Sequence, residues 1–285
     1  IDTLLDETSI LGLAIGMAQN GFVPIPEIQF LAYLHNAEDQ LRGEAATLPF
    51  FSCGQFTNPM VLRIAGLGYH KGFGGHFHND NSLAVLRDLP GVILAVPSNG
   101  ADAVKMLREA VRLAREEQRV VVFLEPIALY SARDLHEPKD GGWLCNYPEP
   151  SQTIGVGEVG FEGKGTDLAI VTFGNGVYLS HQATPELASH GINSRIIDMR
   201  WLSPLPKEAL NKAVEGCKNI LIVDETRHSG GVAEALMAHF HETSHARMAR
   251  LTADDCFIAT GPAYAATMPS KESIVDAALA LVQGA

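Results

Sequence analysis

The sequence predicts a protein of two α/β domains, each a three-layer α/β/α arrangement around a mostly parallel sheet. In both halves, short continuous apolar runs alternate with longer helical segments, the order expected for parallel strands joined by helices. The length of 285 residues favours two domains, each large enough to bury a core. A proline- and glycine-rich stretch without periodicity separates the halves. We therefore expect domains at 1–130 and 157–285, joined by a linker at 131–156.

The first half is expected to begin with the helix Ile10–Asn20, capped by Thr8 or Ser9. Because a glycine inside a helix costs about 1 kcal/mol relative to alanine, we expect Gly12 and Gly16 to let another element pack closely. The other elements expected in this half are the strands Phe22–Phe30 (interrupted by Pro24 and Pro26), Met60–Ile64, Val92–Val96 and Val120–Leu124, and the helices Tyr33–Thr47, Ser82–Leu86 and Ala101–Glu116.

The second half repeats the alternation of strand and helix. The expected strands are Leu168–Phe173, Ser194–Asp198, Ile220–Val223 and Arg247–Leu251, and the expected helices are Tyr178–His190, Lys207–Glu215, Val232–Thr243 and Ser270–Val282.

Composition and charge exclude several classes of protein. The net charge of −12 is spread along the chain, which argues against binding to nucleic acid or to an anionic membrane. The four cysteines lie far apart without a C-x-x-C motif, as expected for free thiols in a reducing compartment. No membrane span or signal peptide is apparent, so we predict a cytoplasmic protein, or a mitochondrial matrix protein in a eukaryote. Because the chain begins at Ile1, we expect a fragment or a processed chain.

The stretch Arg63–Asp80 holds five glycines and three histidines between regular elements. Such a loop is either a mobile surface loop or a ligand site, and both alternatives stay open from these residues alone. The imidazoles of His70, His76 and His78 titrate near neutral pH and could exchange protons. The His76/His78 pair also suggests a metal, but two ligands without a third are a weak signal, and we predict no metal site.

The usual nucleotide and hydrolase motifs are absent: the chain has no G-x-G-x-x-G, no P-loop and no G-x-S-x-G. The segment 224–231 follows a buried strand, where it is either a ligand contact or a plain turn into a helix. We interpret His239, His241 and His245 as the solvated face of a polar helix. Glu7 either helps to cap a helix or, if buried beside a heteroaromatic base, shares a proton with it.

The order of several segments resembles one family. IDTLLDETSILGLAIGMAQNGFVPIPEIQFLAYLHNAEDQL, SCGQFTNPMVLRIAG, GGHFHND, LPGVILAVPSNGADAVKML and VVVFLEP together resemble the β subunit of thiamin-diphosphate-dependent 2-oxo acid dehydrogenases, the E1 component. From GTDLAIVTFGNGVYLS through IIDMRWLSPL to IVDETRHSGGVAE, the second half is similar to the C-terminal domain of that subunit. This resemblance implies a pyrimidine-binding domain followed by a transketolase-type C-terminal domain.

The resemblance implies roles for individual residues. Glu7 matches the glutamate that hydrogen-bonds N1′ of the cofactor's aminopyrimidine, and Leu5 matches a position packed against that ring. Gln29 and Tyr33 match neighbours of the ring, with Tyr33 as the aromatic stacking partner. His78 matches the active-site histidine that serves the substrate carbonyl and the incoming lipoyl group.

His76 is a secondary candidate for the same loop. By this resemblance, the chain would take part in the decarboxylation of a 2-oxo acid and in acyl transfer to lipoyl-E2.

Half of the implied cofactor site is expected elsewhere. The family holds the diphosphate through Mg²⁺ with a G-D-G…N-N motif, and no Gly-Asp-Gly occurs in this chain. The resemblance therefore implies an α-type E1 subunit, or an earlier part of the same polypeptide, as the Mg²⁺-binding partner. It also implies an E2 lipoyl acyltransferase as a partner, and association between β subunits.

Two departures from the family concern its loops. The chain has Asn79-Asp80-Asn81 where many relatives have Ser-Gln after the histidine, which leaves the choice of 2-oxo acid open. The segment Arg112–Arg119 is longer than the usual turn, so the family's potassium site is not carried over. The alternatives are a transketolase or deoxyxylulose-phosphate-synthase relative, a non-catalytic subunit that keeps the fold, and a metal hydrolase on His76/His78.

Overall fold

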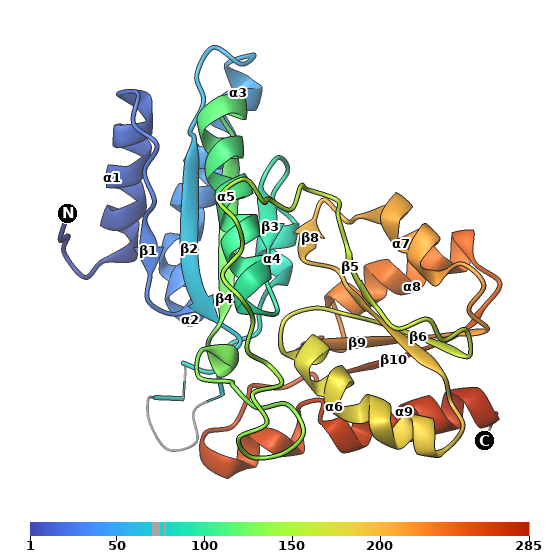
Figure 1. Ribbon diagram of the computed structural model, residues 1–285. Coiled ribbons are helices and arrows are strands. Elements are labelled where there is room, and N and C mark those ends of the chain that lie inside the picture. Colours follow the sequence, from blue (N-terminus) through green and yellow to red (C-terminus); the bar gives the residue numbers. More distant parts are fainter. Residues whose placement is uncertain (70–74, 77, 285) are drawn as a thin grey trace.

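The structure, a computed structural model, describes residues 1–69, 75–76 and 78–284. Two sheets, each with helices packed against it, lie side by side, and the N-terminal sheet stands close to upright in Figure 1. Both sheets are parallel except for one edge strand each, which confirms the predicted fold class.

The N-terminal sheet has the strand order β1-β2-β4-β3-β8. Its strands are β1 (Glu27–Ile28), β2 (Met60–Gly66), β3 (Ile93–Ala95), β4 (Val120–Pro126) and β8 (Trp201–Ser203). The helical segments of this half are α1 (Glu7–Gln19), α2 (Leu31–Leu34), η1 (His35–Ala37), η2 (Gln40–Ala46), α3 (Leu48–Phe51), α4 (Ala84–Arg87), α5 (Gly100–Glu117) and η3 (Ile127–Leu129).

Helices cover both faces of this sheet, because neighbouring residues of a strand point to opposite sides. Leu62 of β2 packs in the cluster that contains Leu34 and Leu86. The preceding residue, Val61, packs in a different cluster with Met106 and Ala110 of α5. The N-terminal half is therefore a three-layer unit.

The C-terminal sheet has the strand order β10-β9-β6-β7-β5. Its strands are β5 (Gly160–Glu162), β6 (Leu168–Thr172), β7 (Ser194–Asp198), β9 (Asn219–Arg227) and β10 (Arg247–Ala253). The helical segments are α6 (Asn175–Ser189), α7 (Lys207–Val214), α8 (Val232–Thr243), η4 (Gly261–Ala266) and α9 (Lys271–Gln283). On one face Ile222 packs with Phe240 of α8, and on the other Leu221 packs with Leu187 and Val275 of α6 and α9.

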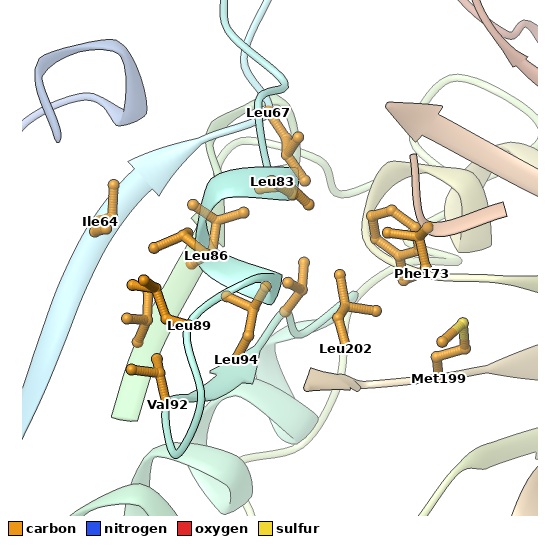
Figure 2. Packing of buried hydrophobic residues seen from close by; sticks show 14 of the residues in the cluster. Ile64, Leu67, Leu83, Leu86, Leu89, Val92, Leu94, Phe173, Met199 and Leu202 are labelled. Carbon is orange, nitrogen blue, oxygen red and sulfur yellow. The ribbon is translucent and has the colours of Figure 1, made fainter. Parts of the chain in front are cut away.

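The two sheets share one core. Phe173, Met199 and Leu202 come from the C-terminal half and belong to the same buried cluster as Leu83 and Leu94 of the N-terminal half. Figure 2 shows these side chains lying between the two sheets. In addition, β8 leaves the C-terminal half and pairs antiparallel with β3. The halves are consequently packed and hydrogen-bonded as one body.

The first strand is much shorter than expected. In place of Phe22–Phe30, only Glu27–Ile28 pairs regularly with β2. Proline lacks an N–H and cannot donate to a ladder. The carbonyls of Pro24 and Pro26 still accept hydrogen bonds from N–H groups of β2, at 3.1 and 2.9 Å, so the segment runs beside the sheet without forming a full strand.

The predicted helix Tyr33–Thr47 is not one α-helix. The chain passes through α2, the 3-10 turn η1, the π-helix η2 and α3 between residues 31 and 51. A hydrophobic period indicates helical structure but does not distinguish these hydrogen-bonding patterns. The remaining expected elements are present with shifts of a few residues at their ends, whereas the short strands β5 and β8 were not predicted.

The helix α1 exposes its two glycines. Had Gly12 or Gly16 carried a Cβ, no atom would lie within 4 Å of it apart from the helix's own neighbouring backbone. The close packing predicted for them is therefore not made within the described chain, and it remains a prediction for a contact between subunits. Among the described residues, no helix combines the length and apolar character needed to cross a bilayer.

Candidate functional site

Glu7 is the first residue of α1 and is half-buried. The helix is capped by Asp6, whose carboxylate accepts a hydrogen bond from the N–H of Ser9 at 2.9 Å. Hydrogen bonds from the side chain and the backbone N–H of Ser9 lower the pKa of Asp6. The expected caps Thr8 and Ser9 were thus wrong by two to three residues. Because Asp6 supplies the cap, the Glu7 carboxylate is not needed for that role, and its Oε2 accepts a hydrogen bond from Asn36 at 3.3 Å.

Tyr33 and His78 lie together although they are far apart in sequence. The Tyr33 hydroxyl and His78 Nε2 are 2.9 Å apart, and the N–H of Gly75 lies 2.6 Å from His78 Nδ1. When Nδ1 accepts from Gly75, the neutral ring carries its proton on Nε2 and donates to the tyrosine oxygen. Phe30 packs edge-on against His78, with ring centroids 4.8 Å apart. The loop is therefore held by aromatic and polar contacts at His78.

Asp80, two residues after His78, is also held in place by hydrogen bonds. Asp80 is buried and accepts from His35 Nε2 at 2.9 Å, while His35 Nδ1 lies 2.5 Å from Glu38. The bond to Asp80, helped by Glu38, raises the pKa of His35 to about 9, so the ring is charged at neutral pH. Burial would raise the pKa of Asp80, but hydrogen bonds from His35 and Ser82 outweigh it and the pKa is lowered.

These contacts converge on one turn of the chain, residues 33–36. Tyr33 contacts His78, His35 contacts Asp80, and Asn36 contacts Glu7. The turn thus joins Glu7, at the start of α1, to His78 and Asp80. Sequence reasoning found Tyr33, Glu7 and His78 but missed Phe30, His35 and Asn36, since no local pattern shows that a residue meets one about 30 to 45 positions away.

The other predicted site residues lie at the surface. Leu5 is 84% exposed, and Gln29 and His76 are also exposed. His70 lies outside the described residues. Such exposure suits positions that a ligand or a partner would cover.

The segment 224–231 belongs partly to a strand, since β9 extends to Arg227. Asp224 is buried and accepts from the N–H of Ala233 at 2.7 Å and from Thr226, so it stabilises the start of α8. Burial raises the pKa of Asp224. The next residue, Glu225, instead contacts the N-terminal half through Tyr69. The plain-turn interpretation is therefore incomplete.

One interpretation of the C-terminal histidines is corrected. His239 is only 7% exposed and packs on the inner side of α8, whereas His241 and His245 are exposed as expected. Burial lowers the pKa of His239, so its ring is neutral rather than solvated. Among the described residues, no group of three or more histidine, cysteine or acidic side chains is placed to hold a metal ion.

A cavity of about 660 Å³ lies along α5 and the following irregular segment, lined by side chains such as Leu107, Phe123 and Leu129. It does not include Glu7, Tyr33 or His78. This cavity is therefore separate from the candidate site.

Comparison with known protein families agrees with this architecture. The model of the transketolase pyrimidine-binding domain matches residues 1–131, and that of the transketolase C-terminal domain matches residues 157–274. The chain therefore belongs to the transketolase family of thiamin-diphosphate-dependent proteins.

Within this family, the chain is similar to β subunits of the pyruvate dehydrogenase E1 component. It is 30% identical to that of Bacillus subtilis and 31% identical to that of Staphylococcus aureus, in each case over 97% of this chain and 82% of the relative. These relatives confirm the family resemblance found in the sequence and favour it over the alternatives. A solved split-gene transketolase, described as an inactive β4 tetramer, has a TM-score of 0.75 at 20% identity, covering 97% of this chain and 81% of that one, and supports the fold alone.

Proposed function

We propose that this chain is the β-type part of a 2-oxo acid dehydrogenase E1 and supplies the pyrimidine half of its thiamin diphosphate site. The turn 33–36 carries the proposal, because it joins Glu7 and His78, the two residues with assigned chemistry, through direct hydrogen bonds. The E1 β subunits among its relatives support the same assignment.

The residues present fit an aminopyrimidine ring. Glu7 offers a half-buried carboxylate whose hydrogen bond from Asn36 is long, at 3.3 Å, which leaves acceptor capacity for a ring nitrogen. Tyr33 and Phe30 present aromatic rings beside His78, and Leu5 offers an apolar side chain that is 84% exposed. A flat heteroaromatic ligand would bury this surface.

Each residue has a separate task in the proposal. Thiamin diphosphate, when bound, supplies the carbon nucleophile and the electron sink for decarboxylation. Glu7 accepts and returns the proton of the pyrimidine N1′ atom, and Tyr33 and Gln29 orient the ring. His78, held at Nε2 by Tyr33, delivers a proton at the substrate oxygen or to the incoming lipoyl sulfur. His76 is a secondary residue of the same loop.

The partners follow from what this chain lacks. Without a Gly-Asp-Gly segment, the Mg²⁺ and diphosphate ligands belong to an α-type subunit or to an earlier part of the polypeptide. The product acyl group passes to lipoyl-lysine of an E2 partner, and β subunits associate with one another. We retain the division into a pyrimidine-binding domain (1–130), a linker (131–156) and a C-terminal domain (157–285), and propose a cytoplasmic or mitochondrial matrix location.

Reconstitution tests the proposal. The chain is combined with its α-type partner, thiamin diphosphate and Mg²⁺, and CO₂ release is measured from pyruvate and from branched-chain 2-oxo acids, with a lipoyl domain as acceptor. We expect decarboxylation of a 2-oxo acid coupled to acylation of the lipoyl domain. Two-carbon transfer between sugar phosphates, with no turnover of 2-oxo acids, would favour the transketolase alternative and contradict the assignment.

A further inference from the structure

Glu225 lies in the core between the two halves and is surrounded by hydrogen-bond donors. Its side chain is buried, with 5% of the residue exposed. The carboxylate accepts from the backbone N–H of Asn175 at 3.1 Å, from Asn175 Nδ2 at 2.6 Å, and from the Tyr69 hydroxyl. Tyr69 belongs to the N-terminal half and stands at the beginning of the histidine loop, residues 69–81. One carboxylate of the C-terminal sheet thus holds the start of that loop.

The same neighbourhood also holds the end of the histidine loop. Asn81 donates from its side chain to the backbone carbonyl of Glu225 at 2.7 Å, and Asn79 donates to the carbonyl of Ala259 at 3.0 Å. On the other side, Tyr69 stacks on Tyr264 with ring centroids 5.3 Å apart. Tyr69 on one side and Asn79 and Asn81 on the other are therefore all held by the C-terminal half.

The backbone at Gly174 comes close to the Glu225 carboxylate. Gly174 precedes Asn175 with φ +53°, a left-handed conformation that favours glycine. A Cβ at this residue would lie 3.0 Å from Glu225 Oε1. A larger residue at 174 would push the carboxylate away from the Asn175 N–H, so the local backbone and Glu225 act as one unit.

Burying an ionised carboxylate costs free energy unless hydrogen bonds or opposite charges compensate it. Burial raises the pKa of Glu225 to about 7, although the hydrogen bonds from Tyr69 and Asn175 act in the opposite direction. Because this folded-state pKa lies above the ordinary value of 4.5, ionisation of Glu225 costs stability as the pH rises from 4.5 towards 7. The adjacent Asp224 stabilises the start of α8, whereas Glu225 accepts from Asn175 at the start of α6 and, in addition, from Tyr69 of the N-terminal half.

We propose that Glu225 is a positioning residue for catalysis: its carboxylate holds Tyr69 and its backbone carbonyl holds Asn81, so that His78, which lies between them in the sequence, stays against Tyr33. The inference rests on the proposed function for the identity of the reaction, but not for the contacts themselves. It gives the C-terminal half a part in the active site although none of its residues is assigned to the cofactor.

Two variants test the positioning role of Glu225, so that the test does not depend on a single variant that fails to fold. Glu225→Gln keeps the shape but replaces an acceptor oxygen with a donor group. Tyr69→Phe removes only the hydroxyl. The matched control is Tyr178→Phe, which removes a hydroxyl that donates to the carbonyl of Asp134 at 2.8 Å, outside the loop.

The first measurement is amide hydrogen exchange of the full chain, alone and in complex with the α-type partner. In both test variants, we expect exchange of the amides of His78 and Leu83 to rise roughly tenfold or more, as for loss of a hydrogen bond to a charged group. Exchange in α8 and β10 should stay at the wild-type rate, and Tyr178→Phe should leave the loop ends unchanged. Unchanged exchange at the loop ends, or an equal rise throughout the C-terminal half, would overturn the proposal.

The second measurement separates positioning from chemistry in the complex. The variants should lower kcat for acyl transfer while exchange of the cofactor's C2 proton, assigned to Glu7, stays near normal. The double variant should have the same kcat as Glu225→Gln alone, because the Tyr69 hydroxyl acts only through its contact with Glu225 in this proposal. Additive losses, or loss of C2 exchange, would contradict the proposal. If the wild-type complex turns over no 2-oxo acid, the proposed function fails, and the exchange of the loop ends still decides the role of Glu225.

Discussion

The pair of His35 and Asp80 gives a prediction with a defined pH dependence. Asp80→Asn removes the charge but keeps the shape, and its remaining oxygen can still accept from Ser82, as Asp80 Oδ1 does from the Ser82 hydroxyl at 2.6 Å. The pKa of His35, raised from 6.5 to about 9 chiefly by the bond to Asp80, is equivalent to about 3.4 kcal/mol at 1.36 kcal/mol per pH unit. Because 41% of the His35 side chain is exposed, solvent screening reduces this, and we expect about 1 kcal/mol.

The sign follows from the direction of the pKa change. Since the folded-state pKa of His35 is raised, the ion pair stabilises the protein fully below pH 6.5 and is lost as the pH rises through about 9. Asp80→Asn should therefore lower the free energy of unfolding by about 1 kcal/mol near pH 6 and by close to nothing near pH 10.

Urea unfolding of wild type and variant at several pH values measures this difference, and an NMR titration of the His35 ring should show its pKa falling towards 6.5. The control is Asp6→Asn, because Asp6 accepts hydrogen bonds from Ser9, which does not titrate, so any effect should be constant over this range. A difference for Asp80→Asn that is independent of pH, or an unchanged His35 titration, would refute the reasoning.

Three further predictions concern binding, assembly and the core. Calorimetry should detect at most weak binding of thiamin diphosphate and Mg²⁺ to the isolated chain and tight binding with the α-type partner; tight Mg²⁺-dependent binding without it would exclude a divided site. Gly12→Leu or Gly16→Leu should disrupt assembly, measured by light scattering, and leave the circular dichroism of the isolated chain unchanged, because both positions are open in the described chain; normal assembly in both variants would argue against an interface. Phe123→Ala should cost about 3–5 kcal/mol in chemical denaturation, since the residue is 2% exposed, whereas Phe51→Ala, 78% exposed, should cost about 0.5 kcal/mol or less, and equal costs would contradict the assigned core.

The sequence was sufficient for the features that depend on local pattern. Continuous apolar runs such as Val120–Leu124 and helices such as Val232–Thr243 were found because burial on both faces, or on one stripe, leaves a clear period. The short strand β8 was missed, since three residues carry no period and its partner β3 lies more than 100 positions away. Strands of this kind are defined by tertiary pairing.

The candidate site could be predicted only in part, because it too depends on contacts between residues that are distant in the sequence. The resemblance marked Glu7, Tyr33 and His78, and the structure brings the last two to hydrogen-bonding distance. The supporting contacts of His35 and Glu225 join residues 45 and 156 positions apart, respectively. Neither has a motif, because the first depends on how distant segments of the N-terminal half fold together, and the second on how the two halves of the chain pack against one another.

The central claim is that Glu7 acts on the pyrimidine ring of the cofactor, whereas His78 acts later, at the substrate oxygen or during acyl transfer to the lipoyl group. Proton–deuterium exchange at C2 of thiamin diphosphate, followed by NMR in the reconstituted complex, tests it most directly. Glu7→Gln, which keeps the shape but lacks the titratable carboxylate, should slow this exchange by roughly 10²–10⁴-fold. His78→Ala should exchange at close to the wild-type rate yet transfer acyl groups poorly to the lipoyl domain. Normal exchange in Glu7→Gln together with lost exchange in His78→Ala would reverse the assignment, and no effect of either variant on exchange or turnover would contradict the account.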